Sequence, residues 1–272
     1  MTVEAVYLRP DDYELETLSR DIGDIPFWSS LLRRERPKRV LEIGSGCGRL
    51  TLPLARLGAE QGFIITGLEM EPAMLRRAQE HARAESADTR RALRLMLGDA
   101  RDLDGALRHS DGRATTFDVI IMPYGVAHHL TTCDARLSAW RGARRWLRAG
   151  GLLAVDVAAP DVARMAAGRV EETPRACDLE VSRDGRTLRR TVATHYDGAT
   201  QVETHAYEYH VQEPDGAQHD YRSDFQMYVY FPHEIETLFR TTGFTLERLI
   251  GSYHGEPFCA DSPLQIGLGR AE

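Results

Sequence analysis

Short apolar runs alternate with amphipathic segments along the first part of the chain. Strands are expected at residues 39–43, 63–69, 93–97, 117–122 and 152–157, and helices at residues 50–57, from 71 and at about 134–147. Pro72 suits the first turn of its helix, because its fixed φ is already helical. Strands that alternate with helices form parallel sheets covered on both faces, so this part is predicted to be a doubly wound α/β sheet.

The pattern changes between residues 177 and 231, where no helical period is present. Three Asp-Gly pairs, at 184–185, 197–198 and 215–216, separate stretches rich in Thr, Val and Tyr. Asp-Gly favours type I′ hairpin turns, so we expect a four-stranded antiparallel meander. His205, Tyr207 and Tyr209 then share one face of its third strand. A helix over 232–242 and strands over 244–250 and 265–268 are predicted to follow.

These patterns predict three regions. Residues 1–36 are expected to form an N-terminal helical lid, because they precede the first strand and contain Tyr7, Tyr13, Phe27 and Trp28. Core packing of Phe27 and Trp28 is the alternative. Residues 37–170 and 232–272 are expected to form the main domain, and residues 171–231 an inserted antiparallel sheet on the substrate side.

Composition narrows the class of protein. Hydrophobic residues make up 42% and charged residues 28%, as in ordinary globular proteins. No apolar window reaches the ~20 residues of a spanning helix, and the N-terminus does not resemble a signal peptide, so a cytoplasmic protein with no membrane partner is expected. Four scattered cysteines indicate neither a disulfide framework nor a zinc ribbon. A net charge of −7 disfavours nucleic acid as a partner.

A glycine-rich loop follows the first predicted strand, with the spacing Gly44-x-Gly46-x-Gly48. Glycines there let the backbone turn sharply and approach a ligand. The spacing differs from the GxGxxG of dinucleotide sites. Glu42 precedes the loop; its carboxylate would repel a pyrophosphate but suits the cationic methionine end of S-adenosylmethionine. A tight turn with no ligand is the alternative.

Two further acids end the second and third predicted strands. Glu69 is placed to accept hydrogen bonds from both ribose hydroxyls of a nucleotide. Asp99 is a candidate acceptor for an adenine amino group, with a helix cap or a solvated loop acid as the alternative.

Together these motifs resemble the ordered motifs of class I S-adenosylmethionine-dependent methyltransferases. The resemblance rests on Val40 to Gly48, Glu69, Gly98-Asp99 and Phe117 to Pro123, and it spans most of the chain. It implies a Rossmann-like seven-stranded sheet whose last two strands form an antiparallel hairpin. It also implies S-adenosylmethionine as cofactor, with the glycines near its methionine portion, Glu69 near its ribose and Asp99 near its adenine. The predicted cofactor-binding set is Glu42, Gly44, Ser45, Gly46, Gly48, Glu69, Met70, Asp99, Ala100 and Pro123.

A narrower resemblance is to bacterial sugar N-methyltransferases, which methylate a nucleotide-linked amino sugar. The stretch Arg183 to Thr187 and the placement of the meander carry it. It implies a small, polar, amine-bearing substrate.

The end of the fourth predicted strand carries the catalytic candidates Tyr124, His128 and His129. In the resembled fold the methyl group points there. Met122 to Gly125 lacks the amide or acid of the Asn/Asp-Pro-Pro-Tyr/Phe tetrad, which weighs against nucleic-acid amines. Adjacent histidines on a helix face different ways, so a metal pair is not expected, nor is a metal site elsewhere. One exposed and one packed histidine is the alternative to a catalytic role.

The predicted reaction is methyl transfer to an amine of a small polar metabolite. Deprotonating an alkyl amine with a pKa of about 8–10 costs roughly 1–4 kcal/mol at neutral pH. Positioning, worth ~7–11 kcal/mol, can offset that cost, whereas an aliphatic alcohol needs a committed base. O-methylation of a phenol or sugar hydroxyl with a histidine base is the alternative, and a non-catalytic cofactor-binding protein is another. Tyr13, Trp28 and Tyr207 are the predicted substrate contacts, and the sequence leaves a homodimer open.

Overall fold

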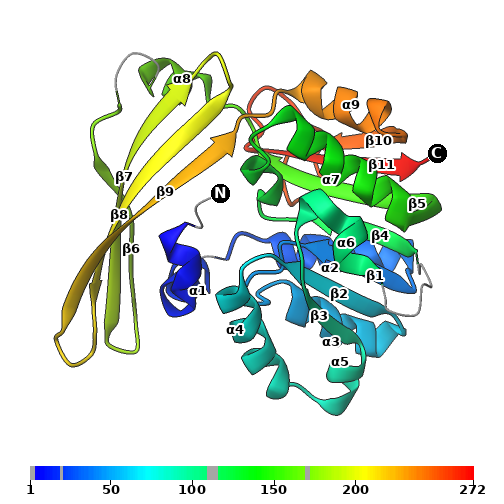
Figure 1. Ribbon diagram of the computed structural model, residues 1–272, viewed down its shortest axis with the longest axis horizontal. Helices are drawn as coiled ribbons and strands as arrows, with labels where there is room; N and C mark the ends of the chain where they lie inside the picture. The colour runs from blue at the N-terminus through cyan, green and yellow to red at the C-terminus, as the bar shows by residue number, and fades with distance from the viewer. Residues whose placement is uncertain (1–3, 19–20, 109–115, 169–171) are drawn as a thin grey trace. The chain divides into compact units, whose positions relative to one another are not determined.

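The computed structural model describes residues 4–18, 21–108, 116–168 and 172–272. The chain divides into two compact units, which are drawn in Figure 1. The smaller unit is formed by Met1–Asp21 and Pro160–Val229, and the larger unit by Ile22–Ala159 and Tyr230–Glu272.

The larger unit is built on a seven-stranded sheet with the order β10-β11-β5-β4-β1-β2-β3. Strands β1 to β5 pair in parallel with one another, and β11 runs antiparallel to both β5 and β10. This confirms the predicted seven-stranded, doubly wound sheet and its C-terminal hairpin. The strands are β1 (Arg39–Ile43), β2 (Ile64–Glu69), β3 (Leu93–Leu97), β4 (Phe117–Met122), β5 (Leu147–Ala158), β10 (Phe244–Ile250) and β11 (Leu264–Ala271).

Helices cover both faces of this sheet (Figure 1). Strand β11 shows why: Ile266 and Leu268 pack into a core with Trp28 and Leu54, whereas Gly267 and Gly269 lie against Phe239 on the other face. The alternation of side chains along a strand therefore puts α2 and α3 on one face and α9 on the opposite face. The helices are α2 (Asp24–Glu35), α3 (Thr51–Gln61), α4 (Pro72–Arg83), α5 (Ala87–Arg91), α6 (Leu103–Leu107), α7 (Cys133–Trp146) and α9 (Pro232–Thr241), with the 3-10 turns η2 (Ala100–Asp102) and η3 (Val126–His129).

The smaller unit contains the predicted meander, an antiparallel sheet with the order β6-β7-β8-β9. One face of this sheet forms a core with the N-terminal segment, in which Val6 and Leu15 pack against Leu188, Tyr209 and Phe225. The elements are η1 (Ala5–Leu8), α1 (Pro10–Leu18), α8 (Val162–Gly168), β6 (Ala176–Arg183), β7 (Arg186–Asp197), β8 (Val202–Gln212) and β9 (Gln218–Tyr228).

The three Asp-Gly pairs do not form identical turns. Asp184 and Gly185 both have positive φ, 52° and 79°, as a type I′ turn requires, and Arg183 pairs with Arg186. The other two pairs lie in longer loops, where Asp197 and Asp215 accept hydrogen bonds from the backbone N–H two residues ahead. The expectation of a type I′ turn at each Asp-Gly pair is therefore wrong for two of the three pairs. An Asp side chain can close a longer turn through its own hydrogen bond to the backbone.

The domain boundaries also differ from those expected from the sequence. Residues 1–36 are not one piece: α1 packs within the smaller unit, whereas α2 contributes Trp28 and Leu31 to the core of the larger unit. Helix α8, placed by the sequence in the main domain, belongs to the smaller unit. Both α1 and α2 carry apolar side chains, and the sequence does not show what these side chains pack against. Only the contacts in the folded chain show that the two helices belong to different units.

Candidate functional site

The predicted cofactor residues of the larger unit follow the carboxyl ends of adjacent parallel strands. The N–H groups of Gly44 and Ser45 both donate to the carbonyl of Leu68, at 2.8 and 3.0 Å, which ties the loop after β1 to the end of β2. The N–H of Gly98, after β3, donates to the carbonyl of Glu69 at 2.9 Å. The structure thus brings the first, second and third strand ends together at one sheet edge, where α/β folds bind ligands.

The glycine loop needs glycine for its backbone conformation. Gly44, Gly46 and Gly48 have φ values of 78°, 54° and 86°, a region that side chains disfavour. A Cβ on Gly44 would also lie 2.4 Å from Cγ2 of Val126, in the segment after β4. Glycine at every second position therefore allows the loop to adopt positive φ three times, and glycine at position 44 allows it to pass close to Val126.

Glu69 anchors this loop. Its Oε2 accepts from the N–H of Gly46 at 2.7 Å, and its Oε1 from the N–H of Glu71 at 2.8 Å. Burial raises the pKa of Glu69, and these backbone hydrogen bonds partly oppose the rise. A carboxylate can accept about four hydrogen bonds, so Glu69 retains acceptor capacity, and its contact with the ribose hydroxyls stays a prediction.

Asp99 follows β3 as predicted, but its carboxylate is already engaged. It accepts from the backbone N–H of Arg101 at 2.8 Å and pairs with the guanidinium of Arg101, and that side-chain bond lowers the pKa of Asp99. The cap weighed in the sequence analysis is thus present, and the adenine contact stays a prediction. Met70 is 49% exposed beside this edge, Ala100 is half-buried and Pro123 is buried.

Three buried oxygens around the glycine loop indicate a polar ligand. Oε2 of Glu42, Oγ of Ser45 and Oγ1 of Thr51 have no hydrogen-bond partner among the described residues. A buried polar atom without a partner costs about 1–3 kcal/mol, a penalty that a bound polar group removes. A carboxyl and two hydroxyls beside a glycine loop fit the amino-acid end of S-adenosylmethionine.

The turn after β4 is held by Asp156 and Tyr253, which the sequence analysis did not select. Tyr124 and Gly125 have positive φ, 58° and 69°. Oδ1 of Asp156, at the end of β5, accepts from the N–H of Gly125 at 2.7 Å, and its Oδ2 accepts from the Tyr253 hydroxyl at 2.5 Å. Burial raises the pKa of Asp156. Asp156 could have been predicted from the sequence, because it is an acid near the end of a predicted strand, as Glu69 is.

A buried ion pair supports the same turn from another side. Asp24 of α2 accepts from Nη1 of Arg49 at 2.9 Å and from Nη2 at 2.5 Å, and both residues are largely buried. The guanidinium carbon of Arg49 lies 4.6 Å from the centre of the Tyr124 ring, a cation–π distance. Tyr124, 41% exposed, is therefore fixed at both its ring and its backbone turn.

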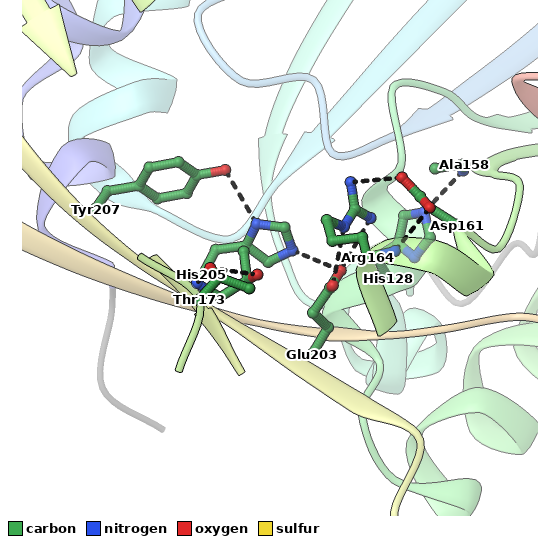
Figure 2. A network of polar contacts seen from close by, with 9 residues as sticks. His128, Ala158, Asp161, Arg164, Thr173, Glu203, His205 and Tyr207 are labelled. Atoms are coloured by element: carbon green, nitrogen blue, oxygen red, sulfur yellow. Dashed lines mark hydrogen bonds and ion pairs between the residues drawn. The ribbon is translucent and has the colours of Figure 1, made fainter. Parts of the chain in front are cut away.

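The two adjacent histidines differ in environment. His128 is buried and packs edge-on against Tyr230, and its Nε2 accepts from the N–H of Ala158 at 2.9 Å (Figure 2). This nitrogen can take a substrate proton only if that bond breaks. His129 is half-buried on η3. His128 is therefore packed, as the alternative expected, whereas His129 is not fully exposed, and the catalytic role of His129 stays a prediction.

The predicted substrate contacts lie in different places. Trp28 is 0% exposed in the core of the larger unit, so the packing alternative holds and the substrate role proposed for Trp28 is wrong. Within the smaller unit, half-buried Tyr13 and largely buried Tyr207 lie at its aromatic core. Tyr207 has the guanidinium of Arg190 4.2 Å from its ring centre, and burial raises the pKa of Tyr207 to about 12.

Figure 2 shows a polar network beside Tyr207, within the smaller unit. The carboxylate of Glu203 accepts from Arg164 at 2.9 and 3.0 Å and contacts Nε2 of His205 at 2.9 Å. Nδ1 of His205 lies 3.4 Å from the Tyr207 hydroxyl. Burial opposes ionisation of Glu203, but its bonds from His205 and Arg164 prevail and lower its pKa. The alternation of β8 predicted that His205 and Tyr207 share a face; Arg164 was not predicted.

The described part of the chain contains neither a metal-binding cluster nor a membrane-spanning helix. No group of three or more His, Cys, Asp or Glu side chains there is arranged to hold a metal ion. No helix in the same ranges has both the length and the apolar character to cross a membrane.

Comparisons with known proteins agree with this geometry. Residues 41–153 match a family described as a methyltransferase domain, and no curated protein matches the sequence. The fold is similar to the sugar N-methyltransferase KedS8 from Streptoalloteichus sp, with 21% identity, coverage of 93% of this chain and 90% of that one, and a TM-score of 0.66. It is also similar to CalS10, an amino pentose methyltransferase from Micromonospora echinaspora (18% identity, 100% and 98% coverage, TM-score 0.66).

A third similar structure is an S-adenosylmethionine-dependent methyltransferase from Clostridium acetobutylicum, with 13% identity, 93% coverage of each chain and a TM-score of 0.72. The family match covers the strand ends and the glycine loop described above. Residues 41–153 therefore form a methyltransferase domain, and the chain has the class I fold of S-adenosylmethionine-dependent methyltransferases.

Proposed function

We propose that the protein methylates an amine nitrogen of a small polar metabolite, an amino sugar or a related amine. The main support is the extent of the structural similarity. It covers 93% of this chain and 90% of a sugar N-methyltransferase, and all of this chain and 98% of an amino pentose methyltransferase. The similarity thus reaches beyond the cofactor-binding sheet into the four-stranded sheet.

The residues at the β4 turn suit an amine acceptor. When bound, S-adenosylmethionine supplies an electrophilic methyl group. An amine needs to be deprotonated and aligned, and the rigid turn around Tyr124 provides alignment, which is worth up to ~7–11 kcal/mol. Nε2 of His128 already accepts a backbone N–H, which leaves His129 as the imidazole assigned to orient the substrate. O-methylation would require His129 as a committed base instead.

Replacement of His129 by Ala separates these reactions. For an amine, kcat/KM should fall by about 10²-fold or less, because the imidazole only orients the acceptor. For a hydroxyl the loss should be ~10²–10⁴-fold, because a general base is removed. The measurement is a pH–rate profile of wild type and His129→Ala on one substrate, with the exposed His233→Ala of α9 as a matched control.

A large loss, with the acidic limb of the profile absent in His129→Ala, would replace amine transfer by hydroxyl transfer. Amine-blocked and hydroxyl-blocked forms of the same substrate provide an independent check. Turnover of the amine-blocked form alone would contradict the proposal.

Asp156 is expected to act as a positioning residue for this turn. Asp156→Ala removes the acceptor for the Gly125 N–H, so the turn should shift and kcat/KM should fall about tenfold or more. Asp156→Asn keeps an acceptor oxygen and should remain within a few-fold of wild type. Both variants should bind S-adenosylhomocysteine as wild type does. Equal losses in the two variants, or normal turnover by Asp156→Ala, would contradict this role.

A further inference from the structure

Glu42, at the end of β1, is an unusual carboxyl group. It is only 2% exposed, and its Oε2 has no hydrogen-bond partner among the described residues. An ionised carboxylate in such a place is costly unless it is paired or hydrogen-bonded. The group must therefore either carry a proton or receive a cation.

Among the described residues, the charged groups around Glu42 do not supply that cation. Asp24 of α2 and Glu69 of β2 are acids, and both oppose ionisation of Glu42. Arg49 is the one cation among the groups that shift Glu42, and its guanidinium already forms a two-bond pair with Asp24.

The balance of these effects favours the protonated acid. Burial raises the pKa of Glu42 to about 8, and the positive charge of Arg49 offsets this only in part. At pH 7 the ligand-free protein therefore holds Glu42 mainly as the neutral acid. The unpartnered oxygens of Ser45 and Thr51, on the loop and helix that follow β1, indicate a polar ligand group at this point.

We propose that the α-ammonium group of the cofactor displaces a proton from Glu42, so that cofactor binding releases one proton to solvent. In the ligand-free protein the proton is covalently held on the carboxyl. On binding, it leaves to the buffer, and the ammonium N–H donates to the resulting carboxylate. The neutral carboxyl becomes a carboxylate only when the ammonium is there to compensate its charge, so the site never contains an uncompensated carboxylate. The proposal does not depend on the methyl acceptor.

Two measurable consequences follow from this exchange. Below the pKa of Glu42, affinity for a ligand with an α-ammonium should rise about tenfold per pH unit, because one proton is released per ligand bound. A ligand without the amino-acid end should show no such dependence. 5′-Methylthioadenosine, which keeps the adenosine and lacks the ammonium, is such a ligand.

The experiment is calorimetric titration of the full chain with S-adenosylhomocysteine at pH 7, in phosphate and in Tris. These buffers differ in ionisation enthalpy, so the difference in binding heat counts released protons. We expect close to one proton for wild type and none for Glu42→Gln, whose amide cannot titrate. Glu71→Gln, which alters a buried carboxyl at the start of α4, should still release one proton. 5′-Methylthioadenosine should release none from wild type.

Buffer-independent heats for wild type with S-adenosylhomocysteine would overturn the proposal. So would equal proton release with 5′-methylthioadenosine, or release that persists in Glu42→Gln. If Glu42→Gln does not bind S-adenosylhomocysteine, the proposal is tested by the affinities of the wild type for both ligands at pH 6 and pH 7. A tenfold change for S-adenosylhomocysteine and none for 5′-methylthioadenosine supports the exchange, and parallel behaviour of the two ligands refutes it.

Discussion

Replacing Glu69 by Ala should lower the affinity for S-adenosylmethionine by about 10²-fold or more. The predicted ribose contact contains two hydrogen bonds to a charged acceptor, each worth ~1.5–3 kcal/mol. Their loss corresponds to roughly two to four powers of ten in Kd, at ~1.4 kcal/mol per tenfold. The structure adds a second cost, because Glu69 also holds the glycine loop through the Gly46 N–H. Calorimetry with S-adenosylmethionine measures the change.

Glu71→Ala is the matched control for that variant. It removes another buried carboxyl of the same segment but keeps the backbone N–H that donates to Glu69. Its affinity should stay within a few-fold of wild type, and circular dichroism should show both variants folded. Wild-type binding by a folded Glu69→Ala would place the ribose elsewhere.

Replacing Asp24 by Ala should lower the free energy of unfolding by about 3–5 kcal/mol. The change leaves the guanidinium of Arg49 largely buried without its carboxylate, which is the costly way to break a buried ion pair. At ~2–4 °C per kcal/mol, the melting temperature of the larger unit should fall by roughly 10 °C. Because the pair is buried, high salt should change this difference little. Chemical and thermal denaturation measure it.

The double variant Asp24→Leu/Arg49→Met tests the cause. Removing both charges leaves no buried ion, so most of the lost stability should return. The ring of Tyr124 would still lose its cation contact, and turnover should therefore remain below that of wild type. A loss below about 1 kcal/mol in Asp24→Ala would show that water reaches Arg49.

The sequence predicted the order of strands and helices because these depend on local patterns. Five apolar runs separated by amphipathic segments predicted the parallel sheet, and Glu69 and Asp99 follow strands whose ends meet. The glycine spacing carried a backbone requirement, since each of Gly44, Gly46 and Gly48 has positive φ. Such requirements are properties of neighbouring residues and are therefore readable from the chain alone.

The sequence did not predict which side chains would meet across the fold. Asp24 and Arg49 lie 25 residues apart, and Asp156 and Tyr253 lie 97 apart. Neither pair has a local signal, because an isolated acid or tyrosine reads equally well as a surface residue. The sequence also did not predict that Trp28 is buried or that α1 and α2 belong to different units, because both depend on contacts with distant segments.

Periodicity along the chain thus predicted a doubly wound parallel sheet, with the glycine loop and the acids at its strand ends, and the resemblance to class I methyltransferases implied the seven-stranded form. The tertiary structure alone decided which of those acids keeps an unpartnered oxygen and which is already satisfied. Glu42 and Asp99 are both acids close to the end of a predicted strand, yet Glu42 Oε2 is buried without a partner among the described residues and Asp99 is paired with Arg101. The Asp99 pair is local, but the burial that raises the pKa of Glu42 comes from segments that are distant in the sequence.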